Sequence, residues 1–245
     1  MERLADAEEL LDGALDDPAA LIGNLRDLRR VNRWLGGVTL SAKAIDAIVG
    51  DGRPAEPVAP PITVLDVGNG GADIPVALLE RAARRGARLE ITGIDSRPEV
   101  LAAAVGADRR LTAAAGLTLH VGDGRSLPYP DGAFDVVHCS LVVHHLAPAD
   151  VEGLLREMSR VARRGVVVND LVRGRLAYVG AWLLAHLLTT NRYTRHDGPL
   201  SVQRAYTLAE LVSAIEGAGL RIVARERGLF GHRWAIAAIR DGAAG

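Results

Sequence analysis

Acidic residues and glycines that could bind a ligand occur together in Ile62-Thr-Val-Leu-Asp-Val-Gly-Asn-Gly-Gly-Ala-Asp-Ile-Pro75. A short run of β-branched and apolar residues ends in Asp66, and a turn with Gly68 and Gly70 follows at once. Glycines at such a turn let the backbone approach a ligand closely. The acid two residues before the first glycine favours a ligand with positive charge, because a pyrophosphate would be repelled there.

The main alternative for this turn is a nicotinamide-binding Rossmann site, which needs the pattern Gly-x-Gly-x-x-Gly. Its third glycine would fall at position 73, where this chain has aspartate. Two glycines alone also fit an ordinary strand-to-helix turn, so the residues further along the chain decide between these interpretations.

Two more acids follow at the ends of expected strands. Asp95 closes the run Thr92-Gly-Ile-Asp95, where a carboxylate can accept both hydroxyls of a ribose. Asp123 lies in Val121-Gly-Asp-Gly-Arg125 and could accept the amino group of an adenine. Either acid could instead be structural, because strand-terminal acids and turn aspartates are common. Together with the glycine turn, they favour a nucleoside ligand.

The glycine turn, the stretch Leu127–Asp135 and the segment Val137-His-Cys-Ser-Leu-Val-Val-His-His-Leu146 together resemble one known family. They resemble the class I methyltransferases that depend on S-adenosylmethionine (SAM), and the small-molecule type similar to the ubiquinone/menaquinone branch. The resemblance covers nearly all of the chain from Ile62 to Ile239. It departs at Ala72, where a third glycine is usual.

This resemblance implies SAM as the cofactor. The sulfonium and amino group of SAM are positively charged and would be attracted to an acid beside the glycine turn. It also implies contacts from the ends of the first four strands. The cofactor-binding residues expected on this basis are Asp66, Gly68, Asn69, Gly70, Asp95, Ser96, Asp123, Gly124, Ser140 and Leu141.

The pattern of the chain predicts an α/β fold. Strand and helix patterns alternate from Ile62 to Asn169, which is typical of a parallel sheet covered on both faces. Leu220–Ala224 and Trp234–Ile239 have no helix between them and predict an antiparallel hairpin. With the resemblance, we expect a seven-stranded, mostly parallel, Rossmann-like methyltransferase sheet with an antiparallel last strand.

Two domains are expected. Residues 1–61 form an N-terminal helical cap and linker, in which Asp17 caps a helix and 51–61 holds four prolines. Residues 62–245 form the SAM-binding methyltransferase domain. Within it, 171–205 is expected to be a helical lid insertion.

The lid insertion contains an apolar stretch, Leu176–Leu188, that is too short for the ~20 residues of a bilayer span. Its aromatic and polar residues suit a lid over an aromatic or lipophilic acceptor, although Trp182 could simply fasten the insertion to the sheet. We expect no stable membrane insertion.

Composition limits the partners. The formal net charge is -1, which provides no general attraction to nucleic acid. The single cysteine, Cys139, and the absence of a signal-peptide pattern predict a cytoplasmic protein. The oligomeric state stays open.

The catalytic base is expected to be a histidine. His196 is preferred, because a turn at Asp197-Gly-Pro199 could aim it inward, and His145 is the second candidate. Asp170 is expected behind them, at the end of the fifth strand. An imidazole titrates near neutral pH and suits a phenolic proton. Either histidine could instead only pack or cap.

No metal site is expected, because His138, His144 and His145 lack the usual ligand spacing. The sequence therefore predicts methyl transfer from SAM, without a metal, to an oxygen or carbon of a small acceptor. An aromatic or polyketide-like acceptor of secondary metabolism is favoured. The alternatives are a non-catalytic SAM-binding regulatory module and a macromolecule methyltransferase.

Overall fold

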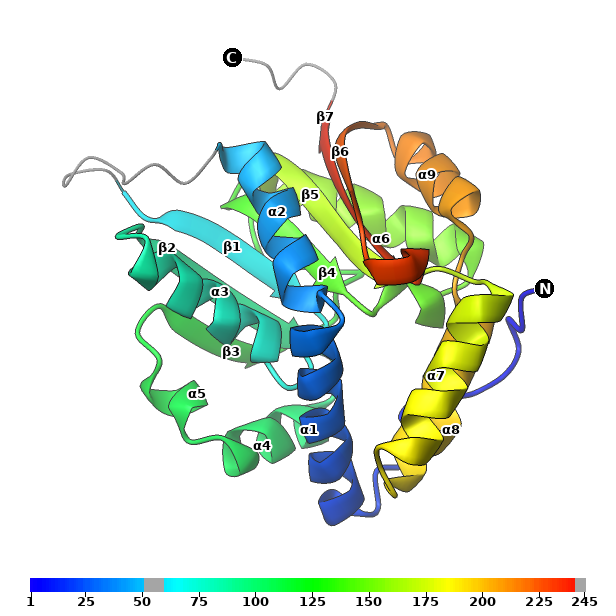
Figure 1. The fold of residues 1–245 in the computed structure, drawn as a ribbon. Helices are drawn as coiled ribbons and strands as arrows, with labels where there is room; N and C mark the ends of the chain where they lie inside the picture. Colours follow the sequence, from blue (N-terminus) through cyan, green and yellow to red (C-terminus); the bar gives the residue numbers. More distant parts are fainter. Residues whose placement is uncertain (51–59, 241–245) are drawn as a thin grey trace.

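The structure is a computed structural model in which residues 1–50 and 60–240 are described. A seven-stranded sheet with the order β3-β2-β1-β4-β5-β7-β6 forms its centre (Figure 1). β7 runs antiparallel to both of its neighbours, and the other pairs are parallel, which confirms the predicted fold. The strands are β1 (Ile62–Val67), β2 (Leu89–Asp95), β3 (Leu117–Val121), β4 (Phe134–Ser140), β5 (Ala162–Leu171), β6 (Leu220–Arg227) and β7 (Arg233–Arg240).

Helices cover both faces of the sheet. α2 (Gly37–Val49) and α3 (Asp73–Arg84) pack on one face. α6 (Pro148–Val161) and α9 (Leu208–Gly217) pack on the other face. α4 (Pro98–Ala107) and the short α5 (Arg110–Ala113) follow β2.

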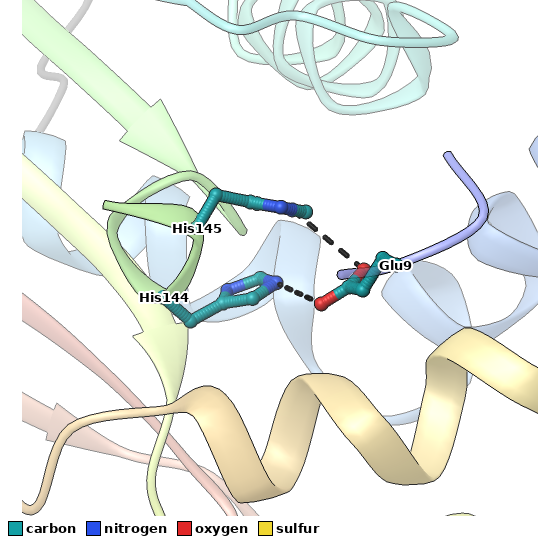
Figure 2. A group of neighbouring side chains, drawn as sticks. All are labelled: Glu9, His144 and His145. Atoms are coloured by element: carbon teal, nitrogen blue, oxygen red, sulfur yellow. Dashed lines mark ion pairs between the residues drawn. The ribbon is translucent and has the colours of Figure 1, made fainter. Parts of the chain in front are cut away.

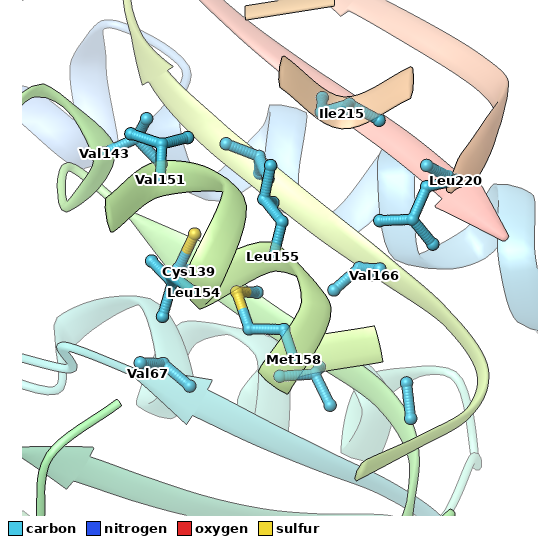
Figure 3. Close-up of a cluster of buried hydrophobic side chains, with 14 of the residues drawn as sticks. Val67, Cys139, Val143, Val151, Leu154, Leu155, Met158, Val166, Ile215 and Leu220 are labelled. Atoms are coloured by element: carbon cyan, nitrogen blue, oxygen red, sulfur yellow. The ribbon is translucent and has the colours of Figure 1, made fainter. Parts of the chain in front are cut away.

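The larger core cluster lies under α6 and α9 (Figure 3). α6 turns apolar residues toward the sheet at helical spacing, and Leu154, Leu155 and Met158 are at most 1% exposed. Burying each of these side chains stabilises the fold by about 1.5–3 kcal/mol. The same core holds the carboxyl ends of β1 and β4 in place through Val67 and Cys139.

The ends of two helices follow the sequence closely. α1 (Pro18–Trp34) begins after Asp17, whose carboxylate accepts a hydrogen bond from the Ala20 amide at 2.9 Å. Thr207 and Glu210 form a complete capping box at the start of α9. The predicted proline-rich linker 51–61 lies, except for its last two residues, outside the described residues.

The lid insertion forms two antiparallel helices, α7 (Arg175–Leu187) and α8 (Arg192–Arg204) (Figure 1). The predicted turn at Asp197-Gly-Pro199 is wrong, because α8 continues through it. A proline inside a helix removes one backbone hydrogen bond, and here neighbouring contacts hold the helix together. Among the described residues, no helix is long and apolar enough to cross a membrane.

The segment after β4 contains a short 3-10 turn, η1 (Val143–His145), which ends at His145. α6 starts only at Pro148. A second 3-10 turn, η2 (Leu229–Gly231), joins β6 to β7.

Candidate functional site

The glycine turn after β1 has the backbone geometry of a ligand cradle. Gly68 and Gly70 have φ values of +70° and +50°, which side chains rarely adopt. A Cβ at Gly68 would collide with Val142, whereas a Cβ at Gly70 would meet no protein atom within 4 Å. Ala72 also has a positive φ, of 52°, at the position where the resemblance calls for glycine.

Asp95 braces this turn from the end of β2. Its Oδ2 accepts a hydrogen bond from the Gly70 amide at 2.9 Å, and its Oδ1 accepts one from the Arg97 amide at 2.9 Å. Burial raises the pKa of Asp95, although these two bonds oppose the shift. Beside it, the buried Oδ1 of Asn69 has no hydrogen-bond partner in the protein. Such an orphaned acceptor in a cradle fits a ligand that donates a hydrogen bond.

Asp66 lies beneath the turn rather than open to it. Its side chain is buried, and its Oδ1 accepts a hydrogen bond from His138 Nδ1 at 2.5 Å. His138 Nε2 in turn lies 2.8 Å from the Ser41 hydroxyl on α2. One oxygen of the predicted cofactor acid is therefore held by the protein itself.

A buried arginine holds the end of β4. Arg233 is 1% exposed and donates to Ser140 Oγ, Asn169 Oδ1 and Asn32 Oδ1, each at 2.6 Å. Burial lowers the pKa of Arg233 to about 10. This network fixes Ser140 at the edge of the cradle. The next residue, Leu141, has a φ of +58°, a strain of about 1–3 kcal/mol that is typical of functional sites.

The remaining predicted cofactor residues lie at the outer ends of β2 and β3. Ser96 and Asp123 are exposed, and Asp123 forms an ion pair with Arg125 at 3.0 Å. Hydrogen bonding from Arg125 lowers the pKa of Asp123. Gly124 packs against Val67, because a Cβ there would collide with that side chain.

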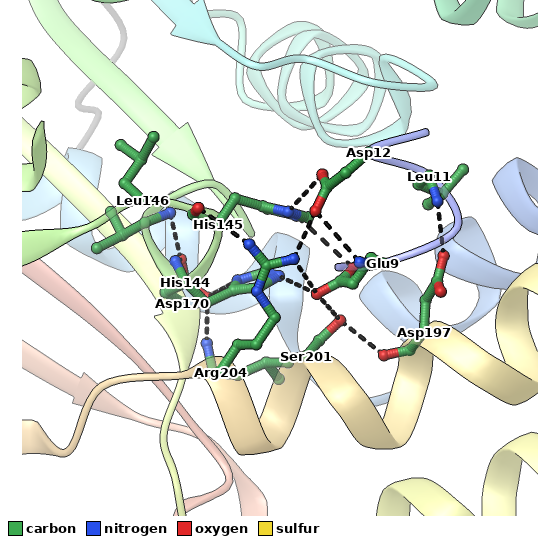
Figure 4. Close-up of polar contacts among 12 residues, drawn as sticks. Glu9, Leu11, Asp12, His144, His145, Leu146, Asp170, Asp197, Ser201 and Arg204 are labelled. Carbon is green, nitrogen blue, oxygen red and sulfur yellow. Dashed lines mark hydrogen bonds and ion pairs between the residues drawn. The ribbon is translucent and has the colours of Figure 1, made fainter. Parts of the chain in front are cut away.

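A second polar cluster lies beside the cradle, at the end of β4 and β5 (Figure 4). His144 is buried, and its Nδ1 donates to Asp170 Oδ1 at 2.7 Å. The other oxygen of Asp170 accepts a hydrogen bond from the Val143 amide at 2.7 Å. Asp170 therefore supports His144, and not His145 or His196 as the sequence had suggested.

Glu9 completes this cluster from the far end of the chain (Figure 2). Its two oxygens lie 3.7 Å from His144 Nε2 and 3.9 Å from His145 Nε2. Ser201 donates to Glu9 Oε1 at 3.0 Å, and Arg204 lies 3.6 Å from the same oxygen. Burial raises the pKa of Glu9 to about 7, so this acid changes charge near neutral pH.

Asp12 lies on the other side of His145. Its Oδ1 is 3.0 Å from His145 Nδ1 without the alignment of a hydrogen bond, and its Oδ2 pairs with Arg204 at 2.5 Å. Burial opposes the ionisation of Asp12, but His145 and Arg204 outweigh it and hold the pKa of Asp12 below its ordinary range.

Both acids belong to an N-terminal strap, residues 3–13, that joins the two halves of the site. On the lid side, the Asp197 carboxylate accepts hydrogen bonds from the Leu10 and Leu11 amides at 2.8 and 3.1 Å. On the cradle side, Arg97 donates to the Leu11 carbonyl at 3.0 Å and to the Gly13 carbonyl at 2.8 Å. The strap therefore closes the space between the cradle and α8.

His196 lies at the outer side of this arrangement. Its side chain is 49% exposed, and its Nδ1 pairs with Asp197 Oδ1 at 2.7 Å. His145, at 28%, is the more accessible of the two cluster histidines. No sequence pattern marks Glu9 or Asp12 as site residues, because they approach the two histidines only after the chain has folded.

Residues 65–168 match a family model described as "Methyltransferase domain". Over these residues the chain is similar to a methyltransferase domain. It is 37% identical to ajmaline N-methyltransferase of Rauvolfia serpentina over 121 residues, 47% of this chain and 37% of that protein. It is 38% identical to demethylmenaquinone methyltransferase of Thermus thermophilus over 107 residues, 43% of this chain and 44% of that protein. Both matches thus span less than half of the relative.

Among solved structures, human N-acetylserotonin methyltransferase in complex with SAM has the same fold, with a TM-score of 0.65 and 18% identity. That match covers 96% of this chain and 59% of the human protein. The methyltransferase domain also fits SAM by its own geometry: Gly70 leaves room for a ligand, Asn69 offers a free acceptor, and Asp95 offers a carboxylate.

Proposed function

We propose that the protein transfers a methyl group from SAM to an oxygen, or a carbon, of a small aromatic or polyketide-like acceptor. The observation that carries this proposal is the cluster of Glu9, His144 and His145 directly beside the cofactor cradle. The names of the relatives and of the human structure also specify small molecules. A net charge of -1 gives no support to a nucleic-acid acceptor.

When bound, SAM supplies a methyl group made electrophilic by its sulfonium. The protein's contribution is to hold the acceptor in line, which is worth about 7–11 kcal/mol in favourable systems. The glycine turn and Ser140 fix one side of the reaction space, and the strap and α8 fix the other.

His145 is the proton acceptor in this proposal. It combines partial exposure with two flanking carboxylates, Glu9 and Asp12, that balance the positive charge of its protonated ring. His144 is 3% exposed and bound to Asp170, so it holds Glu9 in place rather than meeting the acceptor. His196 is the weaker candidate, because it points to the outer side of α8 and pairs with Asp197.

The test is methyl transfer from labelled SAM to a panel of phenols. His145→Gln should lower turnover by about 10²–10⁴-fold, far more than His196→Gln, and should leave SAM affinity intact. The loss should shrink as pH rises and the phenol ionises by itself. A larger loss of turnover in His196→Gln would identify His196, on the lid, as the base. SAM binding without transfer to any acceptor would instead identify a non-catalytic SAM-binding module.

The proposal places this reaction in the cytoplasm and in secondary metabolism. The single cysteine is buried, which suits a reducing compartment, and the lid exposes apolar residues such as Trp182 that suit lipophilic aromatic compounds. Extracting the producing cells and following the methylated product by mass spectrometry would test this assignment.

A further inference from the structure

The cluster beside the cradle also has the donor set of a metal centre. Glu9, His144 and His145 each offer one ligand atom, and these atoms all lie within 4.8 Å of one another (Figure 2). Two imidazole nitrogens and one carboxylate oxygen are the ligands of many zinc sites. Of the histidines weighed from the sequence, His138 drops out, because both of its nitrogens are engaged by Asp66 and Ser41.

The distances are close to those of a bound ion. With Zn–N and Zn–O bonds of about 2.0–2.1 Å, tetrahedral ligand atoms lie about 3.4 Å apart. Glu9 lies 3.7 Å from His144 Nε2 and 3.9 Å from His145 Nε2. These two distances run to different oxygens of Glu9, and the ligand atoms, one from each residue, all lie within 4.8 Å of one another. Side-chain rotation that shortens the longest of these separations by up to about 1.4 Å would bring the atoms to a common centre.

The surrounding groups already orient the ligands. His144 donates its Nδ1 hydrogen to Asp170 at 2.7 Å, which leaves the Nε2 lone pair directed at Glu9. Asp12 lies 3.0 Å from Nδ1 of His145 without the alignment of a hydrogen bond, and its negative charge favours a hydrogen on that nitrogen. A carboxylate behind each histidine is the usual second layer of a metal site, where it fixes the tautomer and strengthens the ligand.

The charge balance also favours a cation. Four carboxylates gather here, those of Glu9, Asp12, Asp170 and Asp197. Three guanidinium groups oppose them: Arg204, Arg233, which acts on Asp170, and Arg3, which donates to the carbonyls of His144 and Leu146. Arg204 lies 3.6 Å from Glu9, but its charge is held by Asp12 at 2.5 Å. A doubly charged ion would compensate the remaining negative charge.

We propose that Glu9, His144 and His145 bind a divalent transition-metal ion of the zinc type, and that the bound ion inhibits methyl transfer. The inhibitory part rests on the proposed function: the lone pair of His145 that accepts the acceptor's proton is the one that the ion occupies. Because Glu9 belongs to the strap, the ion also fastens the strap across the site.

The experiment is calorimetric titration of the chelator-treated full chain with Zn²⁺, together with the visible spectrum of the Co²⁺-loaded protein. One ion per chain and the spectrum of a tetrahedral site are expected. Glu9→Gln and His145→Gln should each weaken binding by about tenfold or more. His120→Gln, at an exposed histidine on β3, should bind as the wild type does.

Absence of binding at micromolar Zn²⁺, or equal binding by all three variants, would overturn the site. The methyl-transfer assay then separates the two proposals. Inhibition of the wild type by Zn²⁺ supports the inference, and undiminished turnover at saturating Zn²⁺ refutes its inhibitory part. If no acceptor is methylated at all, the proposed function fails, while the titration still decides the metal site.

Discussion

Replacement of Glu9 by glutamine should stabilise the protein, and increasingly so as pH rises. Glu9 is buried in the folded chain with a pKa of about 7, against an ordinary value of 4.5. A pKa raised by folding means that the ionised form is disfavoured in the folded state, so stability present below pH 4.5 is lost as pH rises toward and through 7. The full loss is about 3 kcal/mol, at about 1.36 kcal/mol per unit.

Between pH 5 and pH 8, this titration should remove about 2–3 kcal/mol from the free energy of unfolding of the wild type and nothing from that of Glu9→Gln. Urea unfolding of both proteins at the two pH values, with EDTA present, gives the difference directly. Glutamine keeps the shape of the side chain and a hydrogen-bond acceptor for Ser201. An equal stability difference at pH 5 and pH 8 would refute the burial argument, and a larger difference at pH 5 would reverse its sign.

Three other predictions follow from the site and the core. Asp95→Ala should weaken SAM binding in calorimetry through two lost charge-assisted hydrogen bonds, each worth about 1.5–3 kcal/mol, and unchanged affinity would remove Asp95 from the site. Leu155→Ala, at a side chain with no exposure, should lower the free energy of unfolding by about 2–5 kcal/mol, and a loss below 1 kcal/mol would show that α6 collapses into the cavity. EDTA should not lower turnover, because no step of the proposed reaction needs an ion, and activity lost in EDTA but restored by Mg²⁺ would contradict this.

Much of the fold could be predicted because it depends on residues that are close together in the sequence. The alternation of strands and helices, the Asp17 cap and the Thr207 capping box depend on residues a few positions apart, and all are present in the structure. The glycine turn was recognisable for the same reason, because its special backbone angles require glycine at Gly68 and Gly70.

The residues on the acceptor side of the site could not be predicted from such short-range patterns. Glu9 and Asp12 come from an N-terminal stretch with no periodic pattern, and only the folded chain brings them to His144 and His145. The turn expected at Pro199 failed for a related reason. Tertiary contacts of α8 with the strap outweigh the missing backbone hydrogen bond of a proline.

The strap has a consequence for the order in which the molecule assembles. Its residues are synthesised long before Asp197 and Arg204, which hold them. A nascent chain that has reached β4 already contains the glycine turn and Asp95 but cannot enclose Glu9. Contacts between such distant parts of a chain form late and reopen early. The cradle formed by the glycine turn and Asp95 should therefore fold before the cluster of Glu9, His144 and His145 is enclosed. Mild denaturation should expose that cluster first.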